Sequence, residues 1–277
     1  MSIMPHISQL FIYPVKSLGG IAVQSAVVTS RGLQHDRRWM LVDGNNRFLS
    51  QRSNPQLALF QLELIEEGFR ITYVPNQAIQ IIPFIPQTQD VLKVRIWNDE
   101  CNATKVSDEL NAWFSSILNE ETHIVYMSDD SIRHVDTKYA GQGHITSFAD
   151  DYPMLLISEA SLDDLNARLA EPIPMNRFRP NMVVAGIEPY MEDQMLHFTA
   201  AAIDFYGVKT CARCVMTTID QQTAQGSVEP LKTMANYRKS NKKIHFGQNL
   251  VHQGEGVLNV GDDVEILELG QALVFDS

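Results

Sequence analysis

Alternation between apolar and polar positions dominates the first hundred residues of the chain and predicts β-strands. Leu62 and Leu64 alternate with polar neighbours shortly before Gly68, and the alternation resumes beyond that glycine. A strand with one buried face has this period of two, and glycine suits the turn between two such strands. The pattern predicts a hairpin made of residues 57–65 and 69–74. It also predicts strands at residues 7–15 and 91–97, and a second hairpin from residues 39–42 and 47–50 around Asp43-Gly44-Asn45-Asn46.

Helical periodicity is confined to two segments. Ser107 precedes Asp108, Glu109 and a stripe of apolar residues, which is the pattern of a capped amphipathic helix. A stripe of leucines predicts a second helix at about residues 158–170, because a proline lies just beyond its end. Residues 128–151, between the two helices, are polar and show little periodicity. A connection of this length is usually functional or mobile.

The last third of the chain returns to strand-like patterns, at residues 181–185, 200–205, 214–219 and 264–267. Helices are too few to cover both faces of a doubly wound parallel sheet. The 277 residues suffice for one large domain or two ordinary ones. We therefore predict a mainly β protein with a few helices (α+β), in an architecture of barrel-like sheets.

Composition and charge exclude several classes of function. The net charge of −11 argues against broad nucleic-acid binding, because proteins of that class carry basic surfaces. The chain has neither a signal-peptide pattern nor the ~18 consecutive apolar residues of a membrane-spanning helix. Its three cysteines favour a reducing compartment over a disulfide framework. We therefore predict a cytoplasmic protein that binds neither nucleic acid nor a membrane.

The motif with the most chemical potential is Cys211-Ala212-Arg213-Cys214, and its spacing leaves four interpretations open. A zinc site needs more ligands, and no second cysteine pair exists. A thioredoxin-like redox pair normally opens a helix, whereas the residues after Cys214 continue a strand-like pattern. The other two interpretations are a pair of ordinary half-buried thiols and a single thiolate on the metal of a cofactor. In the last case, Arg213 would stabilise the thiolate.

Polar residues elsewhere in the chain suit an anionic ligand, although each also has a plain interpretation as part of a solvated turn or strand end. Lys16-Ser17 precedes two glycines, so this turn offers a cation, a hydroxyl and backbone N–H groups. Arg37 has the geometry to clamp a phosphate. Arg179 and Asn181 face the same side of an extended segment. Asp150, which precedes an apolar segment, is a candidate acid or base near a metal.

The order of these motifs resembles the MOSC family, and within it the branch of amidoxime-reducing components and their bacterial relatives. The similarity runs from about Phe11 to Leu269, which is nearly the whole chain. Its motifs are Tyr13-Pro14-Val15-Lys16-Ser17, Asp36-Arg37, Ser50-Gln51-Arg52, residues 156–162, Phe178-Arg179-Pro180-Asn181, Cys211-Ala212-Arg213-Cys214 with Thr217-Thr218-Ile219-Asp220, Glu229-Pro230-Leu231 and Phe246-Gly247-Gln248.

The resemblance implies an N-terminal MOSC β-domain over residues 1–120 and a MOSC β-barrel domain over residues 121–277. A molybdenum cofactor, molybdopterin with its metal, is expected between them. Two departures from the family pattern affect this region, because Ala212 replaces a usual serine and Asn249 a usual tyrosine. The implied roles are Cys214 as metal ligand, Asp150 as an acidic residue near the metal, Lys16, Ser17 and Arg37 at the cofactor's phosphate, Arg179 and Asn181 at the pterin, and Arg213 beside the cofactor.

The activity that the resemblance implies is the reduction of N-hydroxylated compounds, such as amidoximes and hydroxylamine-type bases. The chain contains no ferredoxin-type cysteine pattern. Electrons are therefore expected from a separate flavin, ferredoxin-like or cytochrome b5-like protein. Pyridoxal phosphate binding is also associated with the family. The alternative is a carrier of the molybdenum cofactor or of sulfur that has no turnover of its own.

Overall fold

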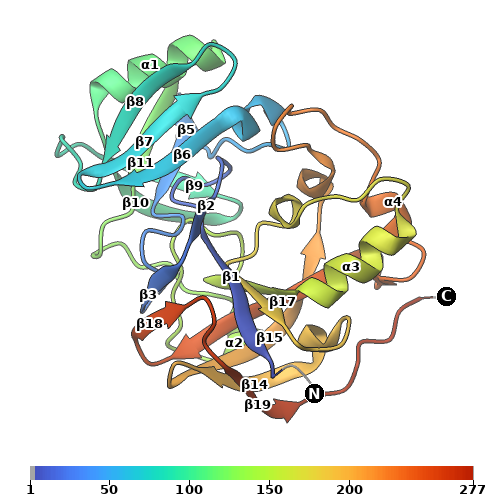
Figure 1. Ribbon diagram of the computed structural model, residues 1–277. Coiled ribbons are helices and arrows are strands. Elements are labelled where there is room, and N and C mark those ends of the chain that lie inside the picture. The colour runs from blue at the N-terminus through green and yellow to red at the C-terminus, as the bar shows by residue number, and fades with distance from the viewer. Residues whose placement is uncertain (1–3, 277) are drawn as a thin grey trace.

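Antiparallel strands form the framework of the protein, which is described over residues 4–276 in a computed structural model (Figure 1). In the largest sheet, the β12–β13 pair is parallel and the other pairs are antiparallel. Its strand order is β19 (Val264–Leu269), β14 (Met195–Ala200), β15 (Ile203–Arg213), β17 (Lys243–Gln253), β12 (Met154–Ser158), β13 (Met182–Ala185), β1 (His6–Ile12) and β2 (Ile21–Val23), with β16 (Lys239–Ser240) paired to β17.

Three smaller sheets complete the strand framework of residues 4–276. One has the order β5 (Trp39–Asp43), β11 (Thr122–Tyr126), β10 (Asp99–Lys105) and β9 (Val91–Ile96). The second consists of β6 (Phe60–Ile65), β7 (Gly68–Tyr73) and β8 (Ala78–Pro83), and the third of β18 (Gly256–Asn259), β3 (Ser25–Thr29) and β4 (Gly32–Leu33). The prediction of a mainly β protein is confirmed, and so is the β6–β7 hairpin.

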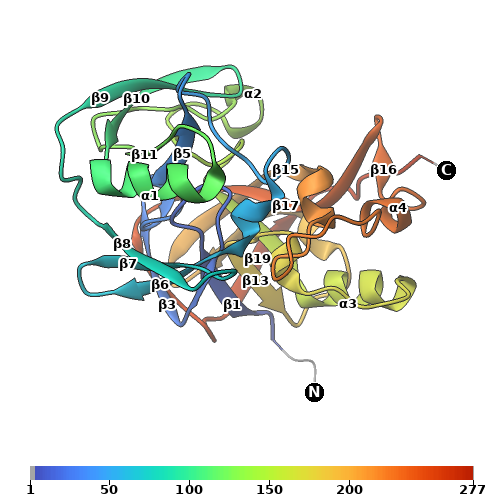
Figure 2. The same cartoon turned by 90° about the horizontal axis from the view of Figure 1, so that it is seen from above.

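Both predicted helices are confirmed, and Figures 1 and 2 show them at opposite ends of the molecule. They are α1 (Asp108–Leu118), capped by Ser107, and α3 (Glu159–Arg168), capped by Ser158. Among residues 4–276, no helix combines the length and the apolar character needed to cross a membrane. The shorter helical segments are α2 (Thr137–Ala140), α4 (Leu231–Met234) and the 3-10 turns η1 (Pro55–Leu59), η2 (Met175–Arg177), η3 (Met191–Gln194) and η4 (Val215–Thr218).

Three strand predictions are wrong in whole or in part. The segment 200–205 contains a tight turn, because Ala201 and Ala202 have φ angles of +50° and +60° and separate β14 from β15. The segment 214–219 forms η4 rather than a strand. In the predicted hairpin 39–50, the second arm forms isolated bridges, from Phe48 to Val42 and from Arg47 to Arg95, in place of a continuous strand. Each of these outcomes depends on the pairing of neighbouring strands, which local pattern does not specify.

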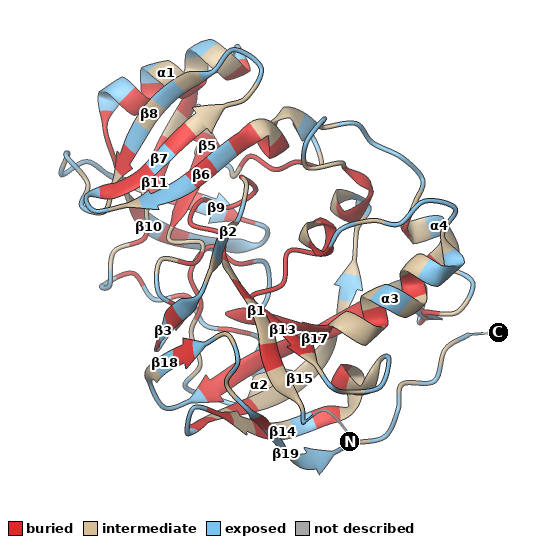
Figure 3. Cartoon of the chain, viewed as in Figure 1, coloured by how far each residue is buried: buried red, intermediate tan, exposed pale blue. Residues whose placement is uncertain are grey.

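Strand pairing ties the N-terminal and C-terminal parts of the chain together. β1 is paired with β13, and β3 is paired with β18. β11, which follows residue 120, is paired with β5 and β10. Figure 3 shows burial along β17 and β13 at the centre and exposure along β19 at the edge. The division of the chain at residue 120 stays a prediction.

Candidate functional site

Side chains from both parts of the chain line one pocket, which has a cavity volume of about 260 Å³. The lining residues come from the turn after β1, from the segments before and after β5, from the β9–β10 turn, from β12 and the segment before it, from β17, and from the surroundings of η2 and η4. The fold therefore brings the predicted residues together, while the role of each stays a prediction. All eight lie in the pocket wall: Lys16, Ser17, Arg37, Asp150, Arg179, Asn181, Arg213 and Cys214.

Three of these residues have left-handed backbone conformations. The φ angles are +69° at Ser17, +50° at Arg37 and +57° at Arg179. This conformation costs a non-glycine residue about 1–2 kcal/mol, and such residues cluster at functional sites. Packing around the pocket therefore maintains a backbone shape that local preference opposes.

Arg37 and Arg179 share one buried aromatic support. Their guanidinium carbons lie 4.6 and 4.2 Å from the centre of the Tyr13 ring. Burial raises the pKa of Tyr13 to about 12, so its phenol stays neutral beside the two cations. Gly20 makes this packing possible, because a Cβ atom there would lie 2.4 Å from the Tyr13 ring. Contact with the Tyr13 ring thus helps to fix the positions of both guanidinium groups in the pocket wall.

The protein itself occupies both terminal nitrogens of Arg37. Nη1 donates to Asp36 Oδ2 at 2.6 Å and to Asn181 Oδ1 at 3.0 Å. Nη2 donates to the carbonyl oxygen of Arg179 at 3.2 Å. Burial opposes the charge on Arg37, but the Asp36 carboxylate outweighs it and raises the Arg37 pKa. Arg37 therefore also orients Asn181 and Arg179, two residues predicted to bind the pterin.

Arg179 lies in a crowded positive field. Burial, together with the neighbouring Arg37 charge, lowers the pKa of Arg179 to about 10. Its Nη1 donates to the carbonyl oxygen of Leu18 at 2.6 Å, which is a neutral partner. An anion in the pocket would offset the repulsion between the positive charges of Arg37 and Arg179.

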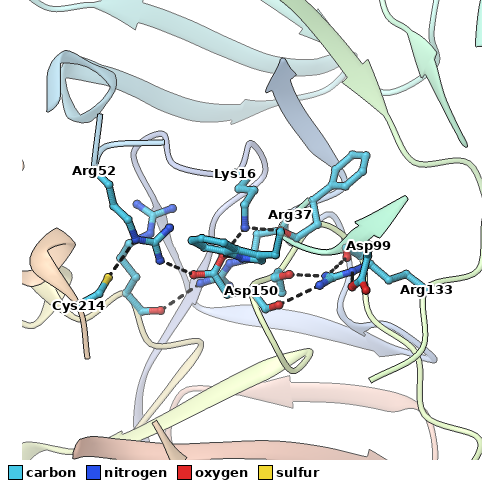
Figure 4. Close-up of polar contacts among 12 residues, drawn as sticks. Lys16, Arg37, Arg52, Asp99, Arg133, Asp150 and Cys214 are labelled. Atoms are coloured by element: carbon cyan, nitrogen blue, oxygen red, sulfur yellow. Dashed lines mark hydrogen bonds and ion pairs between the residues drawn. The ribbon is translucent and has the colours of Figure 1, made fainter. Parts of the chain in front are cut away.

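A chain of polar contacts crosses the pocket from Lys16 to Cys214 (Figure 4). Lys16 Nζ lies 2.5 Å from Asp150 Oδ1, and Arg52 Nη2 lies 3.2 Å from Asp150 Oδ2. Arg52 Nε donates to Cys214 Sγ at 3.4 Å. Trp97 Nε1 donates to Asp150 Oδ1 at 3.3 Å, and its ring lies 4.3 Å from the Arg52 guanidinium carbon. The carboxylate and the thiol are thus joined through one arginine.

Asp150 is held as an ionised carboxylate. Burial opposes its charge, but Lys16 and Arg52 outweigh that effect and keep the Asp150 pKa well below its usual range. Arg133 anchors the backbone on which Asp150 lies, by donating to the carbonyl oxygens of Ser147, Ala149 and Asp150 at 3.1, 2.5 and 2.9 Å. The polar segment 128–151, predicted to be functional or mobile, is therefore tethered where it reaches the pocket.

Cys214 lies where β15 leads into η4, and this position corrects one prediction. The residues after Cys214 form a 3-10 turn, so continuation of the strand is no argument against a redox pair. Arg213 Nη1 donates to Cys211 Sγ at 3.0 Å and its Nη2 to the carbonyl oxygen of Phe178 at 2.6 Å. Arg52 Nε donates to Cys214 Sγ, and the support of the thiolate by Arg213 stays a prediction.

Three pocket residues, Arg52, Trp97 and Arg177, were not predicted to belong to the site. Arg52 was within reach, because it belongs to the Ser50-Gln51-Arg52 motif. Trp97 ends a predicted strand and Arg177 precedes the Phe178-Arg179-Pro180-Asn181 motif, and neither has a local pattern that indicates ligand binding. Their inclusion follows from the packing of the β9–β10 turn and of η2 against the pocket.

The two departures from the family pattern both lie in the pocket wall. Ala212 offers no side-chain donor there. Asn249 Nδ2 donates to the carbonyl oxygen of Lys209 at 3.1 Å, so this amide is engaged by the protein. Their effect on ligand binding stays a prediction.

The charge of the pocket opposes that of the whole chain. Cationic side chains in the pocket wall outnumber the two carboxylates, Asp150 and Asp151, so the pocket is positive. The whole chain, in contrast, carries a net charge of −11. Among residues 4–276, no group of three His, Cys, Asp or Glu side chains could hold a metal ion by itself. A metal on Cys214 would therefore take its other ligands from a cofactor, and the cations suit an anionic one. Six cationic side chains line the wall: Lys16, Arg37, Arg52, Arg177, Arg179 and Arg213.

Comparisons with known proteins identify the family of the chain. Residues 4–121 match the MOSC N-terminal beta barrel domain, and residues 143–265 match the MOSC domain. Mitochondrial amidoxime-reducing component 1 of Mus musculus is 30% identical over 281 residues, covering 94% of this chain and 82% of that protein. Molybdenum cofactor sulfurase of Oryza sativa subsp. japonica is 31% identical over 267 residues, covering 87% of this chain and 32% of that protein. The crystal structure of the YUAD protein from Bacillus subtilis covers 95% of each chain at 10% identity, with a TM-score of 0.41.

Proposed function

This chain belongs to the family that joins a MOSC N-terminal beta barrel domain to a MOSC domain, and we propose on that premise that it is a molybdenum-cofactor-dependent reductase of N-hydroxylated compounds. The observation that carries the proposal is the Cys214 thiol in the wall of a cation-rich pocket. The name of the mouse relative, an amidoxime-reducing component, supports amidoximes and hydroxylamine-type bases as substrates. Electrons would come from a separate flavin, ferredoxin-like or cytochrome b5-like protein.

The residues present fit a molybdenum cofactor, because the pocket combines the Cys214 thiol with an excess of cations and with buried guanidinium nitrogens that lack partners among residues 4–276. When bound, the cofactor supplies two-electron reduction at its metal, and the protein supplies binding, orientation and electrostatics. In this proposal, Cys214 binds the metal as a thiolate, Lys16, Ser17 and Arg37 hold the phosphate, Arg179 and Asn181 hold the pterin, and Arg213 lies beside it.

Reduction of an N–OH group to N–H with release of water consumes two electrons and two protons. Asp150 is ionised at neutral pH, so its carboxylate accepts hydrogen bonds and does not itself donate a proton. The adjacent Lys16 ammonium is buried, and burial lowers its pKa despite the opposing effect of Asp150. In this proposal the proton stays on Lys16 Nζ, and the Asp150 carboxylate accepts a hydrogen bond from that ammonium and orients it.

Replacing Cys214 tests the proposal directly. The protein would be purified from a host that makes the cofactor, and its molybdenum and pterin contents would be measured before any assay. With a chemical reductant and benzamidoxime, the unaltered protein should form benzamidine, whereas Cys214→Ser should reduce turnover to background while keeping the fold. Cys211→Ser is the matched control and should retain most activity, because Cys211 contacts Arg213 rather than Arg52. Full turnover by loaded Cys214→Ser would refute the assignment.

The similarity to a molybdenum cofactor sulfurase favours a second candidate function. In it, the protein carries the molybdenum cofactor or sulfur and does not turn over substrate. The same assay separates the two candidates. A protein that contains molybdenum and pterin but forms no amine with any reductant would be a carrier, whereas amine formation that depends on Cys214 supports the reductase.

Location and one further ligand stay predictions. The small, odd number of cysteines favours a reducing compartment, and the cytoplasm is proposed on that basis. The mouse relative is named as mitochondrial. Pyridoxal phosphate is the further ligand, proposed because its binding is associated with the family.

A further inference from the structure

Arg177 differs from the other arginines of the pocket in its hydrogen bonding. It ends η2, is 7% exposed and lines the pocket. Its Nε and Nη1 are buried and have no hydrogen-bond partner among residues 4–276. Arg37, Arg52, Arg179 and Arg213 each donate at least one side-chain hydrogen bond to the protein.

Burying the Arg177 nitrogens without partners costs free energy, unless a ligand accepts hydrogen bonds from them. Nearly all buried polar groups in proteins have a hydrogen-bond partner, and an unpartnered charged donor loses the solvation it had in water. Burial lowers the pKa of Arg177, and Asp220 opposes this shift from a distance. Asp220 Oδ1 is already occupied by the backbone N–H groups of Gln222 and Thr223. The protein therefore holds a cation in the pocket wall without neutralising it directly.

The geometry of the guanidinium group indicates which chemical group would accept its hydrogen bonds. Arginine presents parallel N–H donors that match the two oxygens of a carboxylate or a phosphate. η2 packs against η4, which begins after Cys214, so Arg177 lies on the side of the pocket that carries the thiol. We propose that Arg177 binds an oxyanion, a phosphate or a carboxylate, of a ligand in this pocket, after a small shift that exposes its nitrogens. The inference concerns binding alone and does not rest on the proposed reductase activity.

The first experiment measures anion binding by calorimetry on protein prepared without cofactor, with inorganic phosphate and benzoate as probes. Arg177→Gln should weaken the binding of at least one probe by about ten- to a hundredfold, the effect of losing a charge-assisted hydrogen bond. Arg177→Lys keeps the charge, loses the paired donors and should recover part of the affinity. The control is Arg70→Gln, which removes an exposed arginine on β7 and should leave binding unchanged.

Thermal unfolding of the same proteins separates a binding role from a structural one. Removing an unpartnered buried charge should raise the melting temperature of ligand-free Arg177→Met while weakening anion binding. A fall in melting temperature together with unchanged affinity in Arg177→Lys would show that Arg177 supports the fold, and would overturn the proposal.

A second experiment distinguishes the two sources of the oxyanion. If Arg177 binds the cofactor's phosphate, Arg177→Gln purified from a cofactor-competent host should contain less molybdenum and pterin per chain. If it binds a substrate carboxylate, the cofactor content should be unchanged, and KM should rise about tenfold for 4-carboxybenzamidoxime but not for neutral benzamidoxime. Unchanged cofactor content, an unchanged KM ratio and unchanged binding of both probes would together contradict the inference.

Discussion

Two polar clusters of the molecule are constructed in opposite ways. The first, the Glu192 cluster, consists of Ser158, Ser161 and Glu192 at the start of α3. Glu192 is fully buried and accepts from Ser158 N at 3.1 Å, from Ser158 Oγ at 2.9 Å and from Ser161 Oγ at 2.8 Å. The second cluster is the pocket, in which Arg177 has two nitrogens and Arg213 one without partners in the described part of the chain.

The difference separates support of the fold from ligand binding. In the Glu192 cluster, both carboxylate oxygens are satisfied, and the negative charge lies near the N-terminal end of α3, where the helix dipole favours it. In the pocket, cations outnumber carboxylates, and three guanidinium nitrogens have no acceptor among residues 4–276. The excess of positive charge together with these unpartnered donors suits the binding of an anionic ligand.

Of the replacements that test this difference between the two clusters, that of Asp150 should have the largest effect on activity. Asp150→Asn removes the carboxylate shared by Lys16 and Arg52 and leaves Lys16 as a buried cation without a charged partner. We expect kcat/KM for amidoxime reduction to fall by about 10²–10³-fold, the range of a lost acid–base group. Steady-state kinetics would measure the loss. Asp151→Asn, at the neighbouring pocket carboxylate, is the control, and an equal loss there would mean that only the net charge of the pocket matters.

Breaking the Glu192 cluster should affect stability and not ligand binding. Glu192→Gln places an amide group where two hydroxyls and one N–H donate, so at least one buried donor loses its acceptor. We expect the free energy of unfolding to fall by about 2–3 kcal/mol, and urea unfolding would measure it. Affinity for inorganic phosphate should stay as in the unaltered protein. A loss of phosphate affinity without a loss of stability would show that the two clusters are not separate.

The smallest effect is expected at Trp97, on the rim of the pocket. Its side chain is 43% exposed, donates to Asp150 and stacks on Arg52. Trp97→Phe keeps an aromatic face and loses the N–H donor, so kcat/KM should fall about twofold to fivefold, whereas Trp97→Ala should lower it further because an exposed cation–π contact contributes about 0.5–1 kcal/mol. Equal kinetics for the two variants would mean that the stacking on Arg52 has no part in the reaction.

Sequence pattern alone was sufficient where structure depends on near neighbours. Ser107 Oγ accepts from Leu110 N, as expected for a helix cap, and the hairpin around Gly68 forms from adjacent strands. Local pattern failed at residues 200–205, because an Ala201-Ala202 turn lacks the glycine or asparagine that usually marks such a turn. It failed again after Cys214, where an apolar run that resembles a strand winds into η4.

The eight candidate residues were identified from motif order, and all eight line the pocket, whereas Arg52, Trp97 and Arg177 were not identified. The sequence did not determine which donors are already engaged. Arg37, Arg177 and Arg213 are the same residue type, yet Arg37 is paired with Asp36 and Arg213 contacts Cys211, whereas two buried nitrogens of Arg177 have no partner among residues 4–276. Hydrogen bonds form between groups that are distant in the chain and close in space, so tertiary structure alone decided which cation is left for a ligand.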